Sequence, residues 1–175
     1  IYSASAPSTP YTTDARGRGP AWANSLFEDN AEFGLGMLLT EETMHDRLKS
    51  VMNEAINSTC CPEELKPLFK EWIDNHKIAD KTVELEAKIT PLLKNTNCKH
   101  CKDIAELSQF LVKKSHWIIG GDGWAYDIGF GGLDHVIASG KNINILVLDT
   151  EIYSNTGGQS SKSTPSAEGV DLEDC

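Results

Sequence analysis

Apolar residues recur at helical spacing through the middle of the chain. In the run TEETMHDRLKSVMNEAI (40–56), Thr40 is a plausible N-cap, because acidic residues follow it in the first turn of the expected helix. The spacing therefore predicts a helix that begins after Thr40 and packs against a neighbouring element. The positions on its apolar face are Met44, Leu48, Val51, Met52 and Ala55.

Further helices are expected before residue 115. Pro62 suits the first turn of the next helix, and two more helices fit residues 80–93 and 103–112. Residues 38–114 are therefore predicted to form a packed helical segment with its charged residues outside. The apolar face of the helix after Pro62 consists of Leu65, Leu68, Phe69, Trp72 and Ile73. The histidines of this segment, which we expect to be solvated, are His45, His76 and His100.

The pattern changes after residue 115. The runs HWII (116–119) and INILVLDT (143–150) are short and apolar, as in buried strands, and a helical pattern separates them. Strand, helix and strand at this length predict a βαβ unit with parallel strands. Gly129 and Gly132 lower helix propensity, which we attribute to close approach of the helix to the sheet. The face expected on the sheet consists of Ala125, Ile128, Gly129, Gly132, Leu133, Val136 and Ile137.

The first 37 residues show little periodicity and are rich in Ser, Thr, Pro and Gly. We expect an ordered irregular segment, with a short helix near SLFEDNAEFG (25–34). The pattern thus predicts an α/β protein with an inserted helical segment, in three parts: 1–37, 38–114 and 115–175. A length of 175 residues suits one domain, and the start at Ile1 suggests a piece of a longer chain.

Charge and composition exclude some classes of partner. The formal net charge of -10 argues against nucleic acid, because phosphate binding needs clustered Lys and Arg. No run approaches the roughly 18 apolar residues of a membrane helix. Five cysteines, an odd number, favour reduced thiols in an intracellular setting.

Distinctive residues follow both predicted strands. Asp122 lies among glycines in Gly120-Gly121-Asp122-Gly123, and the second strand runs into Asp149-Thr150-Glu151-Ile152-Tyr153-Ser154-Asn155. Ligands of parallel sheets bind beyond the carboxyl ends of the strands, so these segments are expected side by side. A dinucleotide site fits poorly, because Tyr126 replaces the third glycine of G-x-G-x-x-G and Asp122 would repel a diphosphate.

A divalent cation removes that conflict. Mg²⁺ prefers oxygen ligands and is typically held by one or two protein groups together with substrate phosphates. Asp122, the hydroxyl of Thr150 and the carbonyl of Ile152 can supply three oxygens. The glycines and the N-terminus of the following helix then let backbone N–H groups approach the diphosphate. The residues predict a metal–diphosphate site.

GDG followed some thirty residues later by Asn resembles the thiamine diphosphate fingerprint. The string GGDGWAYDIGFGGLDHVIASGKNINILVLDTEIYSNTGGQSSKSTP, together with the opening segment, resembles pyruvate:ferredoxin (flavodoxin) oxidoreductases. The resemblance implies the parallel-sheet thiamine-diphosphate-binding fold, truncated here, with residues 1–37 near the cofactor. It makes Asp122, Thr150 and Ile152 the Mg²⁺ ligands and directs Asn155 towards the reacting carbon. The implied cofactor-binding residues are Gly121, Asp122, Gly123, Trp124, Thr150, Glu151, Ile152, Tyr153, Ser154 and Asn155.

The same resemblance implies an activity. The family carries out CoA-dependent oxidative decarboxylation of pyruvate to acetyl-CoA and CO₂, and passes electrons through 4Fe–4S clusters to ferredoxin or flavodoxin. None of the five cysteines matches a cluster ligand, and the glutamate that activates the aminopyrimidine is also absent. The chain alone is therefore expected to be inactive. A homodimer is implied, in the cytoplasm or in an anaerobic organelle such as the hydrogenosome.

Two alternatives remain open. One is a relative that uses another 2-oxo acid or a fused NADP-linked acceptor. The other is a non-catalytic helical or thiol-metal module, in which Cys98-x-x-Cys101 pairs with Cys60-Cys61 and the GDG is only a turn. Several single residues also have two interpretations. Arg16 and Arg18 contact a phosphate or lie at the surface, and Trp124 covers the cofactor or belongs to the core. For His135, packing or a surface role is favoured over catalysis.

Overall fold

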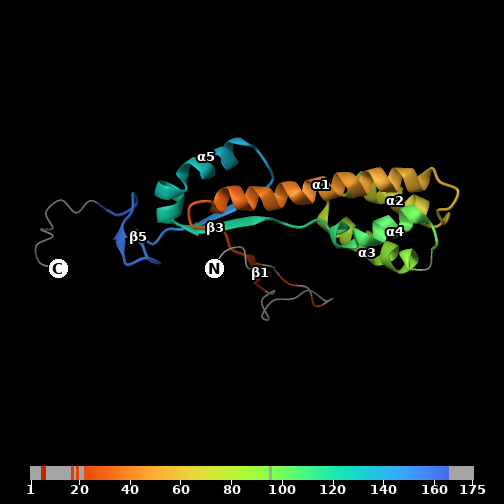
Figure 1. The fold of residues 1–175 in the computed structure, drawn as a ribbon, viewed down its shortest axis with the longest axis horizontal. Coiled ribbons are helices and arrows are strands. Elements are labelled where there is room, and N and C mark those ends of the chain that lie inside the picture. Colours follow the sequence, from red (N-terminus) through yellow and green to blue (C-terminus); the bar gives the residue numbers. More distant parts are fainter. Residues whose placement is uncertain (1–4, 7–16, 18, 20–21, 95, 166–175) are drawn as a thin grey trace, which may run out of the picture. The chain divides into compact units, whose positions relative to one another are not determined.

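The computed structural model describes residues 5–6, 17, 19, 22–94 and 96–165. The chain divides into two compact units, Ile1–Gly36 with His116–Cys175, and Met37–Ser115. Figure 1 shows the helices of the second unit and the β3–α5 region of the first. Arg16, Arg18 and Cys175 lie outside the described residues.

Helices build the Met37–Ser115 unit, as the periodicity predicts. They are the second part of α1 (Asn30–Ile56), then α2 (Leu65–Asn75), α3 (Ala79–Leu93), α4 (Lys99–Glu106) and the short 3-10 helix η1 (Ser108–Phe110). One apolar core joins them, and the Trp72 indole N–H donates to the Leu111 carbonyl within it at 2.7 Å. The largest fully buried side chains of this core are Trp72, Phe69, Leu48, Met52, Leu65, Leu85, Ile89, Ile104 and Leu111.

Three expectations for this unit are wrong. Helix α1 begins at Asn30, so Thr40 lies inside the helix and is not its N-cap; the segment 30–39 is helical in spite of its glycines. The last expected helix starts at Lys99, directly after the extended residue Cys98, and gives way to η1. His45 is buried, with its ring edge-on to Trp72, rather than solvated.

The cysteines also differ from expectation. Cys60 and Cys98 form a disulfide, so the prediction that all thiols are reduced is wrong for this pair. The fold brings the α1–α2 connection next to the start of α4, with a Cα–Cα distance of 5.2 Å, well within the range a disulfide spans. Cys61 and Cys101 are free and buried, with their sulfurs 3.9 Å apart.

The predicted strand–helix–strand unit is present. Strand β3 (Trp117–Gly121) pairs in parallel with β4 (Asn144–Leu148), in a register that runs from Trp117 opposite Asn144 to Gly121 opposite Leu148. The connection consists of a π-helix, η2 (Gly123–Ile128), followed by α5 (Phe130–Ala138). This chain region therefore has the α/β fold that the pattern predicts.

The expected face of the connecting helix is only partly correct. Leu133 and Val136 are buried, but Ile128 and Ile137 are 54% and 63% exposed. The wider turn of η2, closed by the bond from the Gly129 N–H to the Trp124 carbonyl, shifts the side chains out of the α-helical period. A side-chain carbon on Gly129 or Gly132 would meet Trp124 and Glu32 respectively, so the sheet is not the reason for these glycines.

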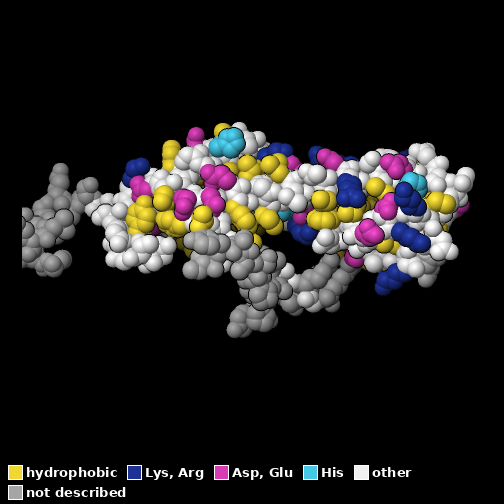
Figure 2. Space-filling model, in the orientation of Figure 1, with side chains coloured by type: hydrophobic (Ala, Val, Ile, Leu, Met, Phe, Trp, Pro, Cys, Tyr) yellow, Lys and Arg dark blue, Asp and Glu magenta, His cyan; other side chains and the backbone are white. Residues whose placement is uncertain are grey.

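Two short ladders complete the first unit. Strand β1 (Ser5–Ala6) pairs antiparallel with β2 (Trp22–Ala23), and β5 (Ile152–Tyr153) with β6 (Gln159–Ser160). Apolar side chains remain on the surface over the region of β3 and α5, as Figure 2 shows. None of the described helices combines the length and the apolar character that crossing a membrane requires.

Candidate metal and diphosphate site

The two parallel strands end side by side. A carboxylate follows the end of β3, and a hydroxyl follows the end of β4. Because Gly121 is paired with Leu148, the residues that follow are neighbours. Asp122 follows β3 and directly precedes η2. Thr150 follows β4 by two residues and faces Asp122. The expectation that the two polar segments meet at the strand ends is confirmed for this pair.

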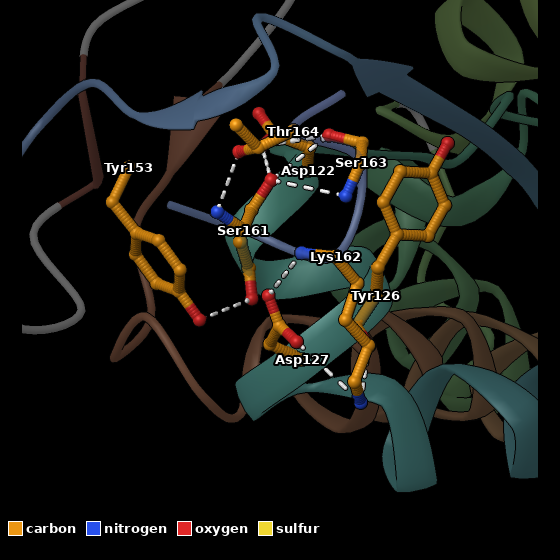
Figure 3. Close-up of polar contacts among 9 residues, drawn as sticks. Asp122, Tyr126, Asp127, Tyr153, Ser161, Lys162, Ser163 and Thr164 are labelled. Carbon is orange, nitrogen blue, oxygen red and sulfur yellow. Dashed lines mark hydrogen bonds and ion pairs between the residues drawn. The ribbon is translucent and has the colours of Figure 1, made fainter. Parts of the chain in front are cut away.

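The carboxylate of Asp122 is buried and receives hydrogen bonds on both oxygens. Its Oδ1 accepts from the backbone N–H and from the hydroxyl of Thr150, each at 3.1 Å. Its Oδ2 accepts from the hydroxyls of Ser161 and Ser163 (Figure 3). These bonds, that from Ser161 above all, lower the pKa of Asp122 to about 2, although burial alone would raise it. Asp122 is therefore ionised at neutral pH.

Thr150 Oγ1 lies close to two further oxygens where the sequence predicts the cation. Thr150 Oγ1 lies 3.1 Å from Asp122 Oδ1 and 3.1 Å from the carbonyl oxygen of Ile152. Adjacent ligands of an octahedral Mg²⁺, at 2.0–2.1 Å from the ion, are about 2.9 Å apart. The intervening residue Glu151 has a φ of 62°, and this left-handed turn directs the Ile152 carbonyl back towards Thr150. The donor set, hard oxygens with one carboxylate, fits Mg²⁺.

Gly123 allows a close approach on the other side of Asp122. The Tyr153 hydroxyl donates to the Gly123 carbonyl at 3.2 Å, and a side-chain carbon on Gly123 would lie 2.5 Å from the Tyr153 ring. Only glycine fits beside this ring. Both residues belong to the predicted cofactor-binding set, and their contact ties the start of η2 to β5.

The sequence of the chain is similar to that of known proteins. No family model matches it. It is 52% identical over 174 residues to the pyruvate-flavodoxin oxidoreductase of Enterobacter agglomerans, which covers 95% of this chain and 15% of that protein. It is 48% identical over 171 residues to the pyruvate:ferredoxin oxidoreductase of Moorella thermoacetica, covering 94% of this chain and 14% of that protein.

The chain matches one segment of the pyruvate:ferredoxin (flavodoxin) oxidoreductases. A third relative, the mitochondrial pyruvate dehydrogenase (NADP(+)) of Euglena gracilis, is 48% identical over 166 residues, which are 94% of this chain and 9% of that protein. The chain thus spans less than a sixth of the length of these relatives. The resemblance to pyruvate:ferredoxin (flavodoxin) oxidoreductases inferred from the sequence is confirmed.

Other residues that the oxidoreductase resemblance implies lie in the turn after β5 or in the apolar core. Ser154 and Asn155 lie in the exposed turn between β5 and β6. Trp124 is 1% exposed and packs against Gly120 and Gly129, so its ring belongs to the apolar core of this unit. The roles of these residues in cofactor binding stay predictions.

Sequence reasoning overlooked one segment of the candidate site. Residues 161–164 (SKST) lie against Asp122, and an open depression of about 480 Å³ is located beside them. The signal was the run of hydroxyl side chains after the glycine pair 157–158, which periodicity does not detect. The depression is lined by Tyr126, Phe130, Asp149, Lys162 and Ser163.

The other candidate metal ligands form no such centre. Among the described residues, no group of three or more His, Cys, Asp and Glu side chains is arranged to hold a metal ion. Two of the four cysteines proposed for a thiolate site are joined to each other in the disulfide. His135 is exposed on α5.

Proposed function

We propose that the chain is the thiamine-diphosphate-binding segment of a pyruvate:ferredoxin (flavodoxin) oxidoreductase. One observation carries the proposal: at the ends of two parallel strands, Thr150 Oγ1 lies 3.1 Å from Asp122 Oδ1 and 3.1 Å from the Ile152 carbonyl oxygen. The identity of about half to pyruvate-flavodoxin and pyruvate:ferredoxin oxidoreductases, over nearly all of the chain, supports it.

Each part of the site has an assigned role. Asp122, Thr150 and the carbonyl of Ile152 hold Mg²⁺, which neutralises the diphosphate that would otherwise be repelled by the carboxylate. Backbone groups of residues 121–124 and 150–155 line the diphosphate, and Asn155 is directed towards the reacting carbon. Thiamine diphosphate supplies the carbon nucleophile and the electron sink for decarboxylation of a 2-oxo acid.

The activity of the whole enzyme follows from the same proposal. Pyruvate and coenzyme A are the substrates, and electrons leave through 4Fe–4S clusters to ferredoxin or flavodoxin. The cluster cysteines and the glutamate that activates the aminopyrimidine belong to parts of the enzyme outside this chain. We expect a homodimer in the cytoplasm or in an anaerobic organelle.

One relative supports NADP⁺ as an alternative electron acceptor to ferredoxin or flavodoxin. The Euglena gracilis relative is named as an NADP-dependent pyruvate dehydrogenase, and it is nearly as similar as the others. Assays of the full-length enzyme with pyruvate and with ferredoxin, flavodoxin or NADP⁺ as acceptor separate the two possibilities. Replacing pyruvate by longer 2-oxo acids tests the substrate range.

Cofactor binding tests the site directly. Thiamine diphosphate binding to the full-length enzyme is measured with and without Mg²⁺, for wild type, Asp122→Ala and Asp134→Ala. Asp134 is an exposed carboxylate on α5 and serves as the matched control. We expect Mg²⁺-dependent binding in wild type and Asp134→Ala, and its loss in Asp122→Ala. Equal, metal-independent binding in all three proteins contradicts the proposal, and zinc in the purified protein would favour the thiol-metal alternative.

A further inference from the structure

The hydroxyl segment, residues 161–164, contacts Oδ2 of Asp122, the carboxylate oxygen that does not face Thr150. Oδ1 lies 3.1 Å from Thr150 Oγ1, which in turn lies 3.1 Å from the Ile152 carbonyl oxygen. Oδ2 accepts from Ser161 Oγ, and Ser163 Oγ lies 3.1 Å away from it. The two carboxylate oxygens therefore have separate partners, and Figure 3 shows the hydroxyl segment beside Asp122.

Each serine has one proton to donate, and the neighbouring acceptors determine its direction. Ser163 Oγ lies 2.9 Å from Asp149 Oδ1 and 2.9 Å from Ser161 Oγ, besides its contact with Asp122. The Ser161 hydroxyl has the Asp122 carboxylate as its charged acceptor, whereas the Ser163 proton is shared between two carboxylates. Ser161 is thus the main support of Oδ2, and Ser163 links Asp122 to Asp149.

The hydroxyl segment is itself fixed to the elements around the site. The Lys162 N–H donates to Asp127 Oδ2 at 3.1 Å, and its Nζ donates to the Tyr126 carbonyl at 3.1 Å, both on η2. The Thr164 hydroxyl donates to the Glu151 carbonyl and accepts from the Ser161 N–H at 2.9 Å. The segment is therefore attached to η2 through Lys162 and to the turn after β4 through Thr164.

We propose that Ser161, with a smaller contribution from Ser163, is a positioning residue for the metal of this site. Its hydroxyl holds Oδ2 of Asp122, so that the carboxylate cannot rotate and Oδ1 stays directed at Thr150 Oγ1 and the Ile152 carbonyl. Hydrogen bonds to the outer oxygen of a ligating carboxylate commonly have this effect on metal affinity. The inference rests on the proposed function, because it assumes the cation at Asp122.

The test is Mn²⁺ binding to the full-length enzyme, measured from the electron paramagnetic resonance signal of free Mn²⁺ with thiamine diphosphate at saturation. We expect Ser161→Ala to weaken Mn²⁺ binding about tenfold or more, and Ser163→Ala to weaken it less. Ser161→Thr, which keeps the hydroxyl, is expected to restore affinity close to wild type. Ser160→Ala, an exposed neighbour on β6, is the matched control and should bind as wild type.

The outcomes separate this inference from the proposed function. Unchanged Mn²⁺ affinity in Ser161→Ala overturns the inference, and so does tighter binding, which would mean that the hydroxyl competes with the metal. Equal weakening in Ser161→Ala and Ser161→Thr also overturns it, because a general packing defect would then explain both. Asp122→Asn is measured alongside: if it too leaves Mn²⁺ binding unchanged, the proposed metal site itself is wrong.

Discussion

Thr150 contacts a single oxygen of Asp122 twice, through its backbone N–H, which donates to that oxygen, and through its hydroxyl, each at 3.1 Å. The residues are 28 positions apart and follow two different strands. The backbone bond fixes the carboxylate to the end of β4, and the hydroxyl places a second oxygen beside it. In the proposed metal site the hydroxyl proton would point away, and a lone pair of Thr150 Oγ1 would be available to the cation.

The two roles of Thr150 can be separated by substitution. Thr150→Val keeps the backbone bond and the shape of the side chain but removes the oxygen, so we expect Mg²⁺ affinity of the full-length enzyme to fall at least about tenfold. Thr150→Ser retains the oxygen and is expected to bind Mg²⁺ nearly as wild type. Equal affinity in the valine and serine variants would show that the hydroxyl is no ligand.

A methyl group on Gly123 is expected to disturb the site through Tyr153. The added carbon would lie 2.5 Å from the aromatic ring, so the ring must move and release the Gly123 carbonyl. We expect Gly123→Ala to destabilise the chain by about 1–3 kcal/mol in urea unfolding.

Two further variants control this measurement. Gly131→Ala, in the first turn of α5 and with open space around it, should be neutral or stabilise by about 0.5–1 kcal/mol. In Gly123→Ala/Tyr153→Ala the clash is absent. The double variant should therefore lose less stability than the two single variants lose together. Strict additivity would mean that the ring is not the obstacle.

Local features of the fold could be predicted from the sequence. Features that depend on packing between distant segments could not. The strand ends and the pairing of Asp122 with Thr150 follow from two apolar runs and the rules for parallel sheets. The π-helix at 123–128 was missed, because side-chain periodicity assumes the α-helical turn. The bonds from Ser161 and Ser163 span about forty residues of chain and depend on how the turn after β6 folds back.

The Cys60–Cys98 disulfide provides a separate test within the helical unit. It closes a long loop, with a sequence separation of 38, and the entropy model assigns such a cross-link roughly 4 kcal/mol of stabilisation. A reductant is therefore expected to lower the thermal midpoint of the chain. Cys60→Ser/Cys98→Ser should have the lower midpoint already and should not respond to reductant. An intact mass without reductant that corresponds to the fully reduced chain would contradict the bond.

The helical unit is also expected to lose stability as the pH falls below neutrality. Burial lowers the pKa of His45 below 6.5, partly opposed by Glu41, and burial also lowers the pKa of His76. The folded state therefore binds fewer protons than the unfolded state, so stability is complete well above pH 6.5 and declines as the pH drops through that value. The slope is at most about 1.4 kcal/mol per pH unit for each histidine.

Urea midpoints at pH 7.5 and 5.5, followed by circular dichroism, measure this loss. His45→Phe keeps a ring against Trp72 but cannot be protonated, so the difference between the two midpoints should shrink and not vanish, because His76 remains. Arg47→Gln, an exposed change on the same helix that leaves both histidines in place, should keep the wild-type difference. If His45→Phe keeps that difference as well, protonation of the buried imidazole is not its cause.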